Sequence, residues 1–242
     1  AGLGVNALYG YLSSESSINW GAGMGPLAGA TQRNESSAEG YGIEGIAGAT
    51  YRINDRWTAG AVLRSGSRIL LKGDETATIV GLGSEHSDFE APVHHPATTG
   101  AGLAWQARKD LKFTCDIAQA WWKGFTSART YDTPGALLKS NKNTYHWFNS
   151  VKFRLGALKR LSEKTEVMGG YAFDTWAIDR KSVDFSTAVD VPMHRFSAAV
   201  SHTWSPVETT LGALAGAGRR TSGGVDYSLY GWYVIGEAKY RF

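Results

Sequence analysis

Cationic side chains recur at alternate positions in several extended segments of the chain, a spacing that would place them on one side of a β-strand. A cation facing an enclosed space could hold a ligand carboxylate through a charge-assisted hydrogen bond. It could equally pair with Glu166, Asp174 or Glu237 and join neighbouring strands, and both interpretations stay open. The candidates for ligand contact, with two ring side chains of the same parity, are Arg64, Arg68, His146, Phe148, Lys152, Arg154 and Arg195.

Other residue types offer little further chemistry. His86, His94 and His95 suggest a metal site, but adjacent strand residues point to opposite faces and no carboxylate–histidine spacing completes one. Cys115 is the single cysteine, which excludes an internal disulfide and favours a small hydrophobic role. No serine has a catalytic motif around it, and no glycine-rich loop leads from a strand into a helix. We therefore expect no enzyme, no metal and no cofactor.

The elements that carry these residues are best seen in the C-terminal segment 230–242. Alternate residues from Tyr230 to Phe242 carry no charge, whereas Glu237, Lys239 and Arg241 share the other face. The ten steps from Trp232 to Phe242 span about 33 Å, or about 25 Å along a membrane normal at a typical strand tilt. This is the height of the apolar band of a membrane barrel, so the segment is predicted to be a transmembrane strand.

The remaining sequence repeats this pattern with a hairpin rhythm. Short connections near 53–56, 108–110, 161–164 and 205–206 alternate with longer polar ones, as periplasmic turns alternate with extracellular loops. The fold class predicted is all-β, an antiparallel transmembrane β-barrel formed by residues 1–242 as a single domain. About ten strands are expected, near 2–12, 40–53, 56–71, 97–107, 111–124, 145–159, 164–178, 192–204, 207–218 and 227–242.

Bulk properties agree with a barrel and disfavour other classes. The net charge of +3 is too small to indicate nucleic acid binding. No apolar run reaches the ~18 residues of a transmembrane helix. The mean hydropathy of −0.25 would suit a soluble carrier, but a barrel hides its lipid-facing side by alternation. Aromatic residues at both ends of the predicted strands favour two interfacial belts and therefore a bilayer.

Several segments resemble the FadL-type transporters of long-chain fatty acids and other hydrophobic compounds in Gram-negative outer membranes. Leu63-Arg64-Ser65 through Gly73 is similar to that family's Tyr-Arg-Ser…Lys-Ile-x-Phe-Lys-Gly strand. Further similar segments follow in the family's order: Gly4–Tyr9, Trp121–Phe125, Tyr171–Asp174 and Val191–Phe196.

The chain also departs from that family. Members have about fourteen strands and an N-terminal hatch with an Asn-Pro-Ala motif, which is missing from this sequence. Two interpretations remain: a C-terminal fragment of a larger barrel, or a reduced relative with about ten strands. In either case, the resemblance implies passive uptake of fatty acids or aromatic hydrocarbons. The alternative is a general porin or a structural barrel without a hydrophobic ligand.

The resemblance also implies partners. Leu137 and Leu138, in a polar loop, would form an extracellular landing site for a hydrophobic small-molecule ligand. Trp232, Tyr240 and the terminal Phe242 would be the signal recognised by the barrel-assembly machinery. Outer-membrane lipid and lipopolysaccharide would surround a multi-pass barrel in the bacterial outer membrane.

Overall fold

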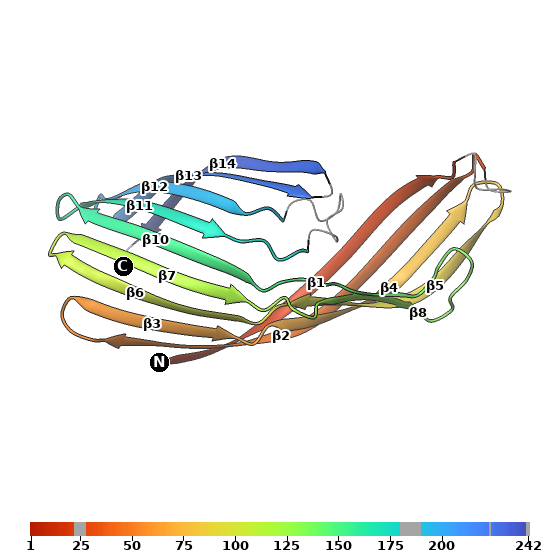
Figure 1. The fold of residues 1–242 in the computed structure, drawn as a ribbon, viewed down its shortest axis with the longest axis horizontal. Helices are drawn as coiled ribbons and strands as arrows, with labels where there is room; N and C mark the ends of the chain where they lie inside the picture. Colours follow the sequence, from red (N-terminus) through yellow and green to blue (C-terminus); the bar gives the residue numbers. More distant parts are fainter. Residues whose placement is uncertain (22–27, 180–189, 223, 241–242) are drawn as a thin grey trace.

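The computed structural model describes residues 1–21, 28–179, 190–222 and 224–240 (Figure 1), and their regular structure is entirely β-strand. No helix in this part of the chain is long and apolar enough to cross a membrane. The strands are β1 (Gly2–Asn19), β2 (Thr31–Arg52), β3 (Trp57–Arg64), β4 (Ser67–Ile79), β5 (Gly83–His95), β6 (Thr98–Arg108), β7 (Leu111–Ala120), β8 (Thr126–Tyr131), β9 (Asn141–Thr144), β10 (Ser150–Arg160), β11 (Thr165–Asp174), β12 (Met193–Thr203), β13 (Val207–Ser222) and β14 (Val225–Tyr240).

Ten of these strands form one curved antiparallel layer, here called the wall. Its order is β14-β13-β12-β11-β10-β7-β6-β3-β2-β1, and the short turns lie together at one end (Figure 1). These ten strands correspond to the ten predicted from the alternation, so the predicted fold class is confirmed. Within the described residues β1 and β14 are the two edges of the wall and do not pair with each other.

The other four strands build a projection beyond the wall, here called the arm. It combines β4, β5, β8 and β9 with the distal halves of β1 and β2 (Figure 1). Strand β2 belongs to both parts, because it pairs with β3 through residues 46–52 and with β4 through residues 32–39. The prediction of longer polar connections was therefore wrong in detail, since much of the segments 13–39, 72–96 and 125–144 is paired strand.

The predicted continuous strand 56–71 is broken into β3 and β4. Gly66, between them, has φ +73°, a left-handed backbone conformation that glycine adopts without steric cost. Beyond this break β4 crosses over β2 at Gly40, where a Cβ would lie 2.2 Å from the Leu70 carbonyl oxygen. Only a residue without a side chain permits that crossing, so Gly40 and Gly66 together direct β4 away from the wall.

The arm has a small hydrophobic core of its own. Phe89 is 1% exposed and its ring lies 5.9 Å from that of Tyr131. Glu75 is buried beside them, where it accepts a hydrogen bond from the Tyr131 hydroxyl (2.5 Å) and pairs with Arg129. A buried carboxylate is tolerated when it is hydrogen-bonded in this way. The cluster comprises Ala38, Ile69, Leu71, Ala77, Phe89, Tyr131 and Leu138.

Candidate functional site

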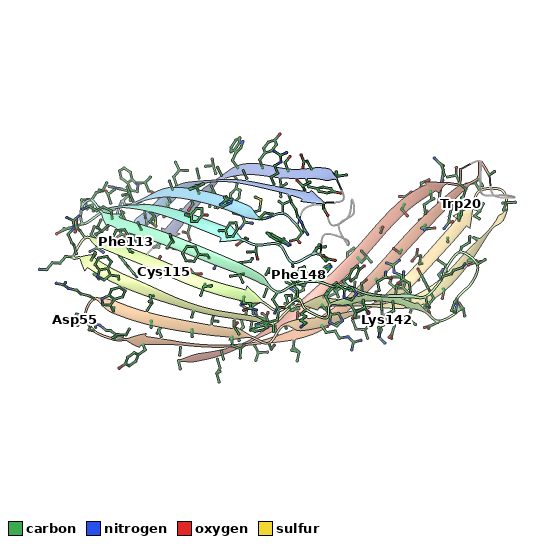
Figure 2. The ribbon with its side chains drawn as sticks, in the orientation of Figure 1. Trp20, Asp55, Phe113, Cys115, Lys142 and Phe148 are labelled. Atoms are coloured by element: carbon green, nitrogen blue, oxygen red, sulfur yellow. The ribbon has the colours of Figure 1, made fainter. Side chains whose placement is uncertain are left out.

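The two faces of the wall differ in chemistry, as the alternation predicted. On one face Trp57, Trp105 and Phe113 stack in a row across neighbouring strands, with ring centroids 5.6 and 5.8 Å apart. Cys115 lies two residues beyond Phe113 on the same strand face (Figure 2). The opposite face carries the ion pairs described below. Since charge on a lipid-facing side is costly, the charged face is assigned to the lumen.

The lumenal face contains a trough with a volume of about 710 Å³, formed mainly on β2, β3, β6 and β7. Most of its floor carries only small side chains, because glycine, alanine and threonine occupy nearly all the lumenal positions of these strands that line it, Val62 and Asp116 excepted. Asp116 and Arg154 bound it toward β10. The lining residues of lumenal parity are Gly2, Gly48, Thr50, Thr58, Gly60, Val62, Gly100, Gly102, Ala104, Thr114, Asp116, Ala118 and Arg154.

Arg154 does not present a free cation to this trough. Its Nη1 donates to Asp116 Oδ1 at 3.0 Å, across the β10–β7 pairing in which the two residues are direct partners. The side chains are 50% and 40% exposed, so water reaches the pair. The trough therefore ends in a neutralised pair of charges rather than in a cation.

Two further predicted ligand cations are also paired. Arg195 of β12 pairs with Asp174 of β11, which lies diagonally across the two strands, since the residue directly opposite Arg195 is Ala172. The other oxygen of that carboxylate, Oδ1, is buried without a hydrogen-bond partner. Arg64 contacts Glu44 at 3.3 Å, and the same carboxylate accepts a hydrogen bond from the Asn6 amide. These arginines therefore form ion pairs between strands, which is the second of the two interpretations that the sequence left open.

The remaining predicted contacts are dispersed. Lys152 lies on the lumenal parity of β10, and no ion pair involving it occurs among the described residues. Arg68 is exposed on β4, after the break at Gly66, so it does not share a continuous strand with Arg64. His146 and Phe148 precede β10, which begins at Ser150, and strand parity therefore does not assign them a face. Phe148 is exposed at the junction of wall and arm (Figure 2).

The predicted landing residues belong to the arm. Leu138 is only 2% exposed and packs in the core of the arm, so its expected exposure was wrong. Leu137 is partly buried against the same cluster. The Glu85 carboxylate holds this loop, since it accepts backbone N–H bonds from Leu137 (2.9 Å), Leu138 (3.1 Å) and Ala136 (2.9 Å). These bonds hold the pKa of Glu85 below its ordinary value.

Two of the three predicted assembly-signal residues are described. Trp232 and Tyr240 are 77% and 60% exposed on β14. Phe242 lies outside the described residues. The histidines are separated: the His86 ring contacts Thr76, and the His94 ring lies edge-on to Phe125. Across the described ranges no group of three potential ligands could hold a metal ion.

Sequence reasoning missed the trough itself. The alternation in Gly100-Ala101-Gly102-Leu103-Ala104 leaves no bulky side chain on one face of β6, and this signal was visible. A run of small uncharged residues carries no group that could bind a ligand through charge, so it does not indicate a site by residue type. The pairing of Arg154 with Asp116 was not visible, because it depends on the register between β10 and β7.

Comparisons with known proteins place these features in context. The model of the family described as outer membrane protein transport protein (OMPP1/FadL/TodX) matches residues 1–211. No curated protein sequence matches the chain.

Several solved structures are similar to the chain. They include the toluene transporter TbuX of Ralstonia pickettii (18% identity, TM-score 0.67), a FadL homologue of Pseudomonas aeruginosa (14%, 0.71) and the toluene transporter TodX of Pseudomonas putida (14%, 0.66). Each match covers 98% of this chain, but the chain spans only 62%, 61% and 63% of those structures.

Proposed function

The chain belongs to the OMPP1/FadL/TodX family of outer-membrane transport proteins, and we propose that it forms part of the wall of a passive channel for uncharged hydrophobic molecules. Membership places it in the outer membrane of Gram-negative bacteria, in a family of transporters rather than enzymes. Two points go beyond family membership: that the substrate is uncharged and hydrophobic, and that its transport is not coupled to an energy source.

The observation that carries the proposal is the trough of small side chains that ends in the Arg154–Asp116 pair. A hydrophobic molecule can lie against a floor of glycine and alanine without displacing bulky groups. It gains by leaving water, at roughly 25 cal/mol for each Å² of apolar surface buried. A carboxylate would gain little here, because Asp116 already neutralises the neighbouring cation.

Fatty acids remain a second candidate because of one residue. Lys152 is two positions from Arg154 along β10 and has no ion-pair partner among the described residues. A carboxylate held by Lys152 would leave its alkyl chain free to enter the trough. The paired state of Arg64, Arg154 and Arg195 favours an uncharged ligand over this alternative.

Uptake by whole cells tests the proposal. A Gram-negative host that lacks its own transporter of this family would express the protein from its native gene. Accumulation of radiolabelled toluene and of oleate would be followed against an empty-vector strain. We expect faster toluene uptake and little change for oleate. Equal uptake of toluene with and without the protein contradicts the proposal, and faster oleate uptake alone favours the Lys152 alternative.

A general porin makes a different prediction. A wet, charged lumen conducts ions steadily, whereas a hydrophobic channel shows saturable uptake of its ligand. Planar-bilayer conductance of the purified protein, measured with and without toluene, separates the two classes.

We also propose that Trp232 and Tyr240 contribute to recognition by the assembly machinery, and that lipopolysaccharide surrounds the wall.

A further inference from the structure

Two described segments of the connection between β11 and β12, residues 175–179 and 190–192, lie at the loop end of the wall and are here called the strap. The Asp190 carboxylate joins them, because its Oδ2 accepts backbone hydrogen bonds from Ala177 (2.9 Å) and Ile178 (2.6 Å). Ala177, Ile178 and Val191 are 6%, 7% and 4% exposed. The strap is thus a packed structure rather than an open loop.

Arg220 of β13 fastens the strap to the wall. Its Nη2 donates to the Ile178 carbonyl at 2.5 Å, and its Nη1 donates to the Asp190 carbonyl at 3.1 Å. The guanidinium lies 5.5 Å from the centre of the Trp176 ring. Arg220 is 7% exposed, and a buried arginine is costly unless such partners satisfy it. The contacts therefore fix both the side chain and the strap.

Steric contacts place the strap on the lumenal side. Gly218 shares the face of Gly216, where an added Cβ would lie 3.1 Å from the Arg195 side chain. An added Cβ at Gly218 would lie 2.3 Å from the Pro192 carbonyl oxygen, so the strap passes directly over this face of β13. At its other end the Phe148 N–H donates to the Ala177 carbonyl at 2.6 Å. The strap thus reaches from β13 to the segment before β10.

We propose that the strap is a constriction at the loop end of the lumen, and that Arg220 is the positioning residue that sets its width. A cavity of about 460 Å³ lies between Trp176 and Pro192 on the strap and the end of β13. A molecule entering along the lumenal face passes through this cavity. The width of the cavity therefore limits the size of the molecules that can enter. The inference rests on the proposed function for the identity of the molecules, but not for the position of the strap.

The first test measures how accessible the strap is to a water-soluble reagent. Ile178→Cys is introduced in a Cys115→Ala background, so that the new thiol is the only one. A water-soluble maleimide should label it slowly, because Ile178 is buried. Adding Arg220→Gln removes hydrogen bonds from a charged group to the strap and should raise the labelling rate by about tenfold. Unchanged labelling would overturn the role of Arg220.

The matched control is Arg160→Gln. Arg160 is the last residue of β10, beside a short turn, pairs with Glu166 at 3.0 Å and has a side chain that is 55% exposed. It carries the same charge at the turn end of the wall, away from the strap, so its loss should leave Ile178→Cys labelling unchanged. A heat-modifiability assay on each variant shows that the protein remains folded.

The second test measures the width of the constriction. Single-channel conductance in the presence of polyethylene glycols of increasing size gives the radius of the mouth without any hydrophobic ligand. Arg220→Gln should admit larger polymers and should raise pyrene uptake relative to toluene several-fold, whereas Arg160→Gln should change neither. Unchanged polymer exclusion in Arg220→Gln overturns the constriction. If the wild type takes up no hydrocarbon, the proposed function fails, and polymer exclusion still decides the inference.

Discussion

Arg154 on β10 and Asp116 on β7 are direct partners in the sheet, and their charged atoms meet at 3.0 Å beside the trough. Because both side chains are about half exposed, the pair contributes roughly 0–1 kcal/mol to stability. Its main effect is on the lumen, where it keeps a cation from attracting anionic ligands. The pair can therefore be altered with little effect on folding.

Asp116→Asn should change ligand preference. The substitution keeps the shape of the side chain but leaves the Arg154 charge unopposed, so the affinity for a carboxylate ligand should rise while that for toluene stays nearly constant. Fluorescent fatty-acid binding to the purified protein measures the effect. The double substitution Asp116→Asn, Arg154→Gln is the control and should lose the gain. A gain that persists in the double variant contradicts this account.

Gly60→Leu should block the trough without disturbing the strand. An added Cβ would meet only Thr50 Cγ2 at 3.6 Å and the Ala49 carbonyl oxygen at 3.7 Å, which are ordinary contacts. The leucine side chain then fills the trough, and toluene uptake should fall several-fold. Ala213→Leu adds a similar bulk to an exposed position on the lipid-facing side of β13 and should leave uptake unchanged. Equal rates for the two variants would exclude the trough as the path.

The two leucines of the arm should behave differently. Leu138→Ala removes a buried side chain from the core of the arm and should destabilise it by about 2–5 kcal/mol, measured by hydrogen exchange of β5 and β8 amides. Leu137→Ser should have a smaller effect on exchange but should slow uptake at low toluene concentration if Leu137 is part of a landing site. Unaltered uptake at every concentration would remove the landing role.

The loop that Glu85 holds should respond to acid. Backbone N–H groups of Leu137, Leu138 and Ala136 stabilise the carboxylate, so the pKa in the folded state lies below the ordinary value of 4.5. The contribution is complete above pH 4.5 and is lost as the pH falls through the lower folded-state pKa. Amide exchange of Leu137 should therefore accelerate in this acidic window. Glu85→Gln should exchange faster at neutral pH and show no such acid step.

The alternation of side chains predicted the wall because each of its strands separates lipid from lumen. The arm has no such division. In β2 the segment 32–37 is polar on both faces, and its strand character comes from pairing with β1 and β4 rather than from burial. A pattern search for one apolar face could not detect it. The break at Gly66 was hidden for a related reason, since Arg64 and Arg68 keep the same parity across it.

The candidate site was predictable in composition but not in pairing. The charged residues share one face of the strands, as the alternation predicted and as Arg154 and Asp116 show. Their neutralisation depends on which residues of neighbouring strands lie opposite each other, and that register is set by the whole sheet. The strap could not be predicted from the sequence either, because Arg220 and Asp190 are thirty residues apart and belong to no recognisable motif.

The junction between wall and arm has a consequence for protein engineering and for divergence within the family. Arg64, the last residue of β3, is the direct partner of Thr98, the first residue of β6. The two ends of the intervening β4–β5 hairpin therefore lie next to each other. A hairpin connected in this way can be shortened, lengthened or exchanged for a two-residue turn while β3 and β6 keep their register. The β3–β6 pairing supplies a constant frame, and any change in the hairpin has to be matched only within the arm, by the parts of β1, β2 and β8 that pair or pack with it.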